Sequence, residues 1–66
     1  MNENEKKWYN EGVGLSNLGR HEEAIEAFKK AIEINPNNAA AWYNKGVGLG
    51  NLGRYEEAIE AFKKGN

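Results

Sequence analysis

Apolar residues recur along this chain at steps of three and four, and no segment alternates with the period of two that is typical of a strand. One stripe runs from Trp8 through Leu15 to Leu18, with Gly12 at the intermediate step. A second, more strongly apolar stripe consists of Ala24, Ile25, Phe28, Ala31 and Ile32. Both stripes occur again further along the chain. The pattern therefore predicts helices over residues 5–18, 21–34, 39–52 and 55–64.

The residues around the stripes indicate where the helices begin and end. Asn4 and Asn38 are the predicted N-caps of the first and third helices, because an asparagine side chain can accept a hydrogen bond from a free backbone N–H there. Gly19 and Gly53 are expected in the left-handed conformation that commonly ends a helix. Asn35-Pro36 cannot continue a helix and forms the predicted link between two hairpins.

The chain repeats itself at an offset of 34 residues. Residues 8–30 match residues 42–64 at all but three of 23 positions, and the differences are Glu11/Lys45, Ser16/Gly50 and His21/Tyr55. A recent duplication and a sequence built from a consensus both explain such identity. We expect an all-α fold of two stacked antiparallel helix-turn-helix hairpins, as one domain over residues 1–66 with repeat units at about 5–38 and 39–66, the second truncated.

The apolar stripes of the two units should face each other and form one small core. The predicted core residues are Trp8, Leu15, Leu18, Ala24, Ile25, Phe28, Trp42, Leu49, Leu52, Ala58, Ile59 and Phe62. A chain of 66 residues buries only about 60% of the surface of its unfolded form. The stability of the fold should therefore be marginal.

Composition narrows the function classes. The net charge is −1, from nine basic and ten acidic residues, so no charge excess favours nucleic acid or an anionic membrane as a partner. No cysteine is present and His21 is the single histidine, so we expect no metal site and no cofactor. The polar, acidic N-terminus is no signal peptide, and the cytoplasm is the default compartment.

The motifs that could carry chemistry have simpler structural explanations. The run Gly48–Gly53 matches G-x-G-x-x-G, but a dinucleotide site needs a strand before that motif, and here it lies inside a predicted helix. His21 has Tyr55 as its counterpart, which favours packing at a helix start over metal binding or base catalysis. The glutamates lie beside lysines on predicted solvent-facing helix surfaces. We therefore expect no catalytic residues and no enzymatic activity.

At this level of detail the chain resembles the tetratricopeptide repeat family, whose period of 34 carries a W-x2-L-G-x2-Y…A-x3-F…P pattern. Matching residues are Trp8, Gly12, Ala24, Phe28 and Pro36 in the first unit and Trp42, Gly46, Ala58 and Phe62 in the second. The chain departs from the pattern at Glu11 and Lys45, where leucine is usual, and at Leu15 and Leu49, where tyrosine is usual. The resemblance covers about residues 5–64 and implies a protein–protein interaction module.

The resemblance also implies where a partner would bind. In the family, the first helices of successive units line a concave groove that holds a peptide or protein segment. Mapped onto this chain, the eight peptide-binding residues are Tyr9, Asn10, Val13, Asn17, Tyr43, Asn44, Val47 and Asn51, with Asn10 and Asn44 at the edge of the groove. Ser16 and Gly50 would also lie in the groove. The chaperone-tail clamp found in some members is not expected, because Tyr9 and Val13 replace its lysine and asparagine and only Asn44 matches.

Self-assembly is the alternative function. Each unit of a repeat stack buries its apolar face against a neighbour, and here no further helix follows the fourth one. Ile59 and Phe62 should then remain open at the end of the stack and mediate weak homo-oligomer formation. A structural or engineered minimal repeat scaffold, whose main contacts are with copies of itself, belongs to this second class. The partner's identity is not encoded in any of these patterns.

Overall fold

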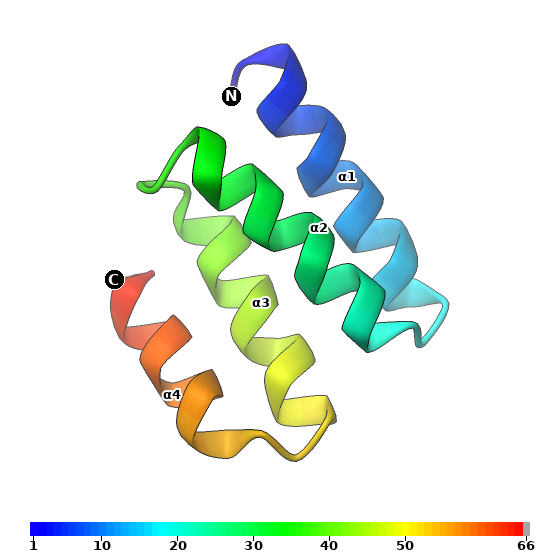
Figure 1. Cartoon of the computed structure of the whole chain (residues 1–66), viewed down its shortest axis with the longest axis vertical. Helices are drawn as coiled ribbons and strands as arrows, with labels where there is room; N and C mark the ends of the chain where they lie inside the picture. The colour runs from blue at the N-terminus through cyan, green and yellow to red at the C-terminus, as the bar shows by residue number, and fades with distance from the viewer. Residues whose placement is uncertain (66) are drawn as a thin grey trace.

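The computed structural model describes residues 1–65, which form four helices and no strand. The helices are α1 (Glu3–Asn17), α2 (His21–Ile34), α3 (Ala39–Asn51) and α4 (Tyr55–Lys64). They lie side by side in a single layer of helices (Figure 1). In this layer α2 packs between α1 and α3, and α4 packs on α3. The chain is therefore an all-α helical repeat of two stacked antiparallel hairpins, as the periodicity predicts.

The turns within the two hairpins are built alike. Gly19 and Gly53 have φ angles of 77° and 78°, so each takes the left-handed conformation expected of it. The N-cap of α3 is Asn38, whose side chain accepts a hydrogen bond from the Ala41 backbone N–H at 2.9 Å. The prediction of Asn4 as the first N-cap is wrong, because α1 begins earlier, at Glu3, and Asn2 caps it.

A close approach of the two helices in each hairpin depends on one glycine. A Cβ atom at Gly12 would lie 2.6 Å from the ring of Phe28, and one at Gly46 would lie 2.5 Å from the ring of Phe62. Such distances are far below van der Waals contact, so only glycine lets these rings pack so closely against the first helix of the hairpin. The small residue and the aromatic ring therefore act as one packing unit in each hairpin.

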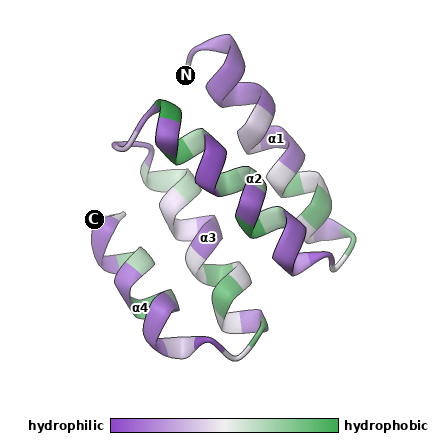
Figure 2. Cartoon of the chain, viewed as in Figure 1, coloured by the Kyte–Doolittle hydropathy of each residue, from purple (hydrophilic) through white to green (hydrophobic). Residues whose placement is uncertain are grey.

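The core is smaller than the apolar stripes predict. Phe28 and Leu49 are its largest fully buried side chains, and Figure 2 shows apolar and polar residues alternating along α2. Leu18, predicted in the core, is 71% exposed because α1 ends at Asn17 and Leu18 belongs to the turn. Leu52 occupies the equivalent turn position and is also exposed. The core assignment of Ile59 is wrong as well, since its side chain is exposed on α4.

A buried carboxylate joins the two hairpins at their N-terminal ends. Glu5 is only 2% exposed, and its Oε2 atom accepts hydrogen bonds from the side-chain amides of Asn35 at 2.9 Å and Asn38 at 2.8 Å. Burial by itself raises the pKa of Glu5, but these two bonds and the backbone N–H of Asn2 outweigh it and lower the pKa below its usual value. The same carboxylate completes a capping box with Asn2, whose Oδ1 atom accepts from the Glu5 N–H at 2.7 Å. Glu5 therefore ties the start of α1 to the start of α3.

Candidate functional site

A depression of about 390 Å³ lies along the first helices of the two hairpins. From α1 it is lined by Tyr9, Val13, Ser16 and Asn17, from α2 by His21 and Phe28, and from α3 by Asn44, Val47 and Asn51. The α1 and α3 residues recur at steps of three and four, so each helix presents one continuous face to the depression. Apolar side chains and amides alternate along that face, which gives a bound chain both contact area and hydrogen-bonding groups.

One hydrogen bond spans the depression. The side-chain amide of Asn44 donates to the Tyr9 hydroxyl at 3.0 Å, and the Tyr9 ring packs against Phe28 with ring centroids 5.8 Å apart. Tyr9 is therefore held in place from below by the core and from the side by α3. The bond fixes the relative position of the two walls, and the Oδ1 atom of Asn44 has no hydrogen bond within the described residues 1–65.

The structure brings together six of the eight peptide-binding residues that the family resemblance implies, together with Ser16. Asn10 is exposed on α1 and does not line this depression. Tyr43 lies instead beside Phe62 in a separate hollow between α3 and α4, with ring centroids 5.5 Å apart. Tyr9 and Tyr43 therefore occupy different surroundings, because α3 covers one side of Tyr9 and no helix of residues 1–65 covers the same side of Tyr43.

His21 is a lining residue that the sequence reasoning assigns to packing alone. It begins α2 at the closed end of the first hairpin and is half-buried in the wall of the depression. Its Nδ1 atom is buried and has no hydrogen-bond partner within residues 1–65. A buried polar atom without a partner is costly, so His21 Nδ1 is a candidate recognition group in this wall. The sequence feature that could have singled out His21 is that the equivalent position of the second hairpin is Tyr55.

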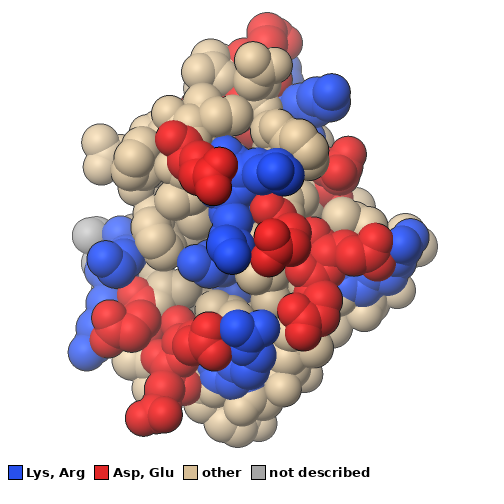
Figure 3. Space-filling model, in the orientation of Figure 1, with Lys and Arg blue, Asp and Glu red and all other residues tan. Residues whose placement is uncertain are grey.

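The opposite surface is charged. The face that Figure 3 shows, over α2 and α4, carries acidic and basic side chains side by side. Within the helices, Glu26 pairs with Lys29 at 3.4 Å, and Arg54, just before α4, pairs with Glu57 at 2.8 Å. The Arg54 guanidinium lowers the pKa of the Glu57 carboxyl. The glutamates of these exposed pairs are neutralised by neighbouring basic side chains, as expected for a solvated face.

Residues 1–65 contain neither a cluster of metal-binding side chains nor a helix suited to cross a membrane. No group of three or more histidine, cysteine, aspartate or glutamate side chains is arranged so that it could hold a metal ion. None of the helices in this part of the chain has both the length and the apolar character needed to cross a membrane.

Comparison with known proteins accounts for the repeated hairpins. Two models described as tetratricopeptide repeat match the chain, one over residues 6–38 and the other over residues 27–60. The chain belongs to the tetratricopeptide repeat family. Tetratricopeptide repeats are generally protein-interaction or scaffold modules, and they are a fold without catalytic function of its own. The depression on this tetratricopeptide repeat chain is thus a candidate contact surface for a protein or peptide.

A relative of the chain is the uncharacterized protein MJ0572 of Methanocaldococcus jannaschii. The two are 52% identical over 39 residues, which is 54% of this chain and 45% of the relative. The tetratricopeptide repeat chain thus matches less than half the length of that protein.

Proposed function

We propose that this tetratricopeptide repeat chain binds a peptide or protein segment in the depression between α1 and α3. The observation that carries the proposal is the convergence of Tyr9, Val13, Asn17, Asn44, Val47 and Asn51 on one surface from two helices that are 34 residues apart in the sequence. The family supplies the class of partner, and the lining residues supply the means of recognition.

The chemistry of the lining suits a segment with a small apolar side chain and a free backbone. Val13 and Val47 offer apolar contact, and Val47 is 39% exposed before any partner binds. Asn17 and Asn51 can each donate to and accept from a partner's peptide group. His21 adds a ring nitrogen that has no partner within residues 1–65. Affinity should be modest, because a standard protein interface buries about 800 Å² on each partner and this depression is lined by only nine residues.

The test is selection of peptides from a random display library, followed by chemical-shift mapping on the labelled chain. The largest shifts are expected at Val13, Asn17, Val47 and Asn51. Val47→Lys should weaken the selected peptide at least about tenfold, which corresponds to about 1.4 kcal/mol. Ile34→Lys is the matched control, because Ile34 is also a 39% exposed aliphatic residue but lies at the end of α2, outside the depression. Shifts centred on Glu22, Glu26, Glu56 and Glu60 would instead place the binding site on the outer face.

Self-association is a second candidate function, and a specific observation favours it. Ile59 is exposed and Phe62 is half-buried, whereas their counterparts Ile25 and Phe28 are buried. We propose that a weak homo-oligomer forms through this side of α4, either by head-to-tail stacking or by two-fold pairing. The melting temperature should then rise with protein concentration, and Ile59→Lys should remove that dependence. A monomeric mass by sedimentation at about millimolar concentration, the weak range of such contacts, would exclude it.

A further inference from the structure

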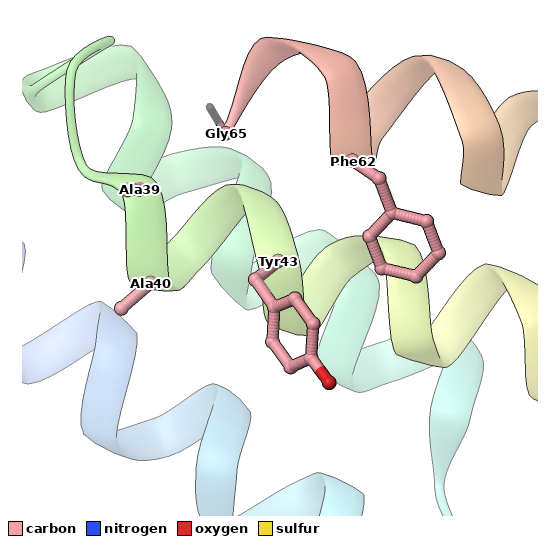
Figure 4. A pocket seen from close by; sticks show the side chains of 5 residues that line it. All are labelled: Ala39, Ala40, Tyr43, Phe62 and Gly65. Atoms are coloured by element: carbon pink, nitrogen blue, oxygen red, sulfur yellow. The ribbon is translucent and has the colours of Figure 1, made fainter.

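The end of the stack carries an open surface between α3 and α4. A hollow of about 670 Å³ is lined by Ala39, Ala40, Tyr43, Phe62 and Gly65, and Ile59 lies one turn before Phe62 on α4. Figure 4 shows the rings of Tyr43 and Phe62 projecting from neighbouring helices into this region. We call these six residues the end surface. It is distinct from the depression between α1 and α3.

The first hairpin shows what covers the equivalent surface. Positions 34 residues earlier include Tyr9, Ile25, Phe28 and Ala31, and there α3 lies against them. Phe28 and Ala31 are fully buried, and the exposed fraction of Ile25 is 4% against 52% for Ile59. Tyr43, Ile59 and Phe62 repeat Tyr9, Ile25 and Phe28, whereas Ala39, Ala40 and Gly65 stand where the first hairpin has Glu5, Lys6 and Ala31. The end surface therefore keeps the three large side chains of a surface that already binds a helix within this molecule.

Apart from the N-cap Asn38, whose bond to Glu5 has no equivalent at Ala39, three residues of α3 make close contacts with the first hairpin. Ala41 is fully buried in the cluster of Ala24, Phe28 and Ala31. The Asn44 amide donates to the Tyr9 hydroxyl at 3.0 Å. Gly48 lies so close to Ile25 that an added Cβ would be 3.0 Å from its Cγ1 atom. The contact face of α3 thus reads Ala-x-x-Asn-x-x-x-Gly.

The first helix of a second copy carries two of these three residues. Asn10 and Gly14 are the counterparts of Asn44 and Gly48, but Lys7 stands where α3 has Ala41. All three lie on the exposed side of α1. In the pose of α3, the Lys7 side chain would occupy the fully buried place of a methyl group. Four methylene groups do not fit between such closely packed helices, and a buried, unpaired ammonium group is strongly unfavourable.

Other charged residues of a second copy's first hairpin neither favour nor prevent the docking of its α1 on the end surface. Arg20 is the counterpart of Arg54, which reaches Glu22 of the first hairpin at 3.5 Å, so a second copy could place Arg20 by Glu56 in the same way. Glu11 replaces Lys45, whose surroundings include both a glutamate, Glu26, and a lysine, Lys29. Lys7 is therefore the residue that sets the chain's own helix apart from α3.

We propose that the end surface binds a helix from another protein, in the pose that α3 takes on the first hairpin, and that Lys7 keeps further copies of this chain from stacking there. The partner helix carries a small residue, an asparagine three positions later and a glycine four positions after that. The asparagine donates to the Tyr43 hydroxyl, and the glycine lies on Ile59. Head-to-tail growth of the stack is thereby blocked, which leaves two-fold pairing as the route for self-association.

The experiment uses a variant of the chain itself as the helix donor. Lys7→Ala gives α1 the complete contact face, and Ile59→Lys in the same molecule closes its own end surface, so this double variant is a helix donor that cannot polymerise. Both substituted residues are exposed, and circular dichroism should confirm an unchanged helix content. The labelled acceptor is the unmodified chain. The donor should bind it at least about tenfold more tightly than the Ile59→Lys single variant, because burial of an ammonium group is removed.

Chemical shifts locate the contact and decide the outcome. The expected perturbations in the acceptor are at Ala40, Tyr43, Ile59 and Gly65, and Tyr43→Phe in the acceptor should weaken binding several-fold. Equal binding by the donor and by the Ile59→Lys single variant would overturn the proposal, as would an acceptor whose own Ile59→Lys change has no effect. Head-to-tail association of the unmodified chain, as tight as the binding of the donor, would overturn it too. None of these results depends on peptide binding between α1 and α3, where the shifts would fall on Val13 and Val47.

Discussion

The first and second hairpins carry almost the same residues, but equivalent side chains differ in burial and in their contacts. Phe28 is buried and Phe62 is half-buried, although each packs on an equivalent glycine. The Tyr9 ring packs on the core and its hydroxyl accepts a hydrogen bond from Asn44, whereas Tyr43 is 59% exposed. The difference comes from α3, which covers the first hairpin and has no counterpart over the second among residues 1–65.

This comparison separates two sources of stability in a repeat fold. Contacts within a hairpin, such as Gly12 with Phe28, recur in both units and depend on local sequence. Contacts between hairpins, such as Gly48 with Ile25, exist once and depend on having a neighbour. In a two-unit stack both hairpins share the single interface between them. They differ in α4, which has 10 residues against 14 in α2 and has no helix over its outer side within residues 1–65. The second hairpin should therefore be the weaker part.

The largest effect is expected from the two phenylalanines. Phe28→Ala should destabilise the chain by about 3–5 kcal/mol, because a fully buried ring leaves a cavity under α3. Phe62→Ala removes the same ring from a half-exposed site and should cost at least ~1 kcal/mol less. Urea unfolding of both variants at low protein concentration gives the comparison. Equal losses would mean that Phe62 is covered in solution, and an effect of concentration would then identify a second copy as the cover.

The sequence was sufficient to predict the hairpins because local signals agree there. Period, turn glycines and the glycine–phenylalanine pairs all point to the same four helices, and the predicted ends of α2 and α4 match the structure. Burial was harder to predict. Ile25 and Ile59 have identical neighbours in sequence, so no local pattern distinguishes the buried residue from the exposed one. Leu18 fits the apolar stripe but lies just beyond the helix end, where the stripe no longer faces the core.

In the candidate site, too, the placement of most residues could be predicted, whereas contacts between distant segments could not. Residues on α1 and α3 could be assigned to one surface because the family resemblance implies a groove lined by the first helix of each unit. Tyr43 could not be separated from Tyr9, since their surroundings differ only through α3. The role of Glu5 was missed because its hydrogen bonds come from Asn35 and Asn38, about 30 residues away, and a capping box at Asn2 was the only local sign.

A smaller effect, one that depends on pH, is expected at Glu5. Its pKa is lower in the folded chain than in the unfolded one, so the unfolded chain binds more protons and stability falls with falling pH. The contribution is present above the unfolded pKa of about 4.3 and is lost as pH falls through the lowered folded value. The second hairpin has Ala39 at this position and lacks the effect.

Glu5→Gln isolates that contribution from the other acidic groups. The unmodified chain should lose more stability than the variant between pH 7 and about pH 3, as measured by urea unfolding at each pH. Glu57, whose pKa is also lowered, is present in both proteins and cancels from the difference. Parallel pH profiles of the two proteins would show that the bonds from Asn35 and Asn38 do not persist in solution.

The smallest effect is a difference in sign between two equivalent glycines. Gly14 has no heavy atom within 4 Å of where a Cβ would be placed, so Gly14→Ala should stabilise the chain by up to about 1 kcal/mol through better helix propensity. At Gly48 the same methyl group would meet Ile25 Cγ1 at 3.0 Å, and the crowding should offset or reverse that gain. Gly50 controls for the difference between helices, because it lies in α3 like Gly48 but faces open space like Gly14. Thermal unfolding of the three single variants should therefore rank Gly14→Ala and Gly50→Ala together, above Gly48→Ala. If Gly48→Ala were as stabilising as the other two, α3 would not rest on Ile25 in solution. The packing of α3 on the first hairpin would then no longer support a glycine in the helix that the end surface is proposed to bind.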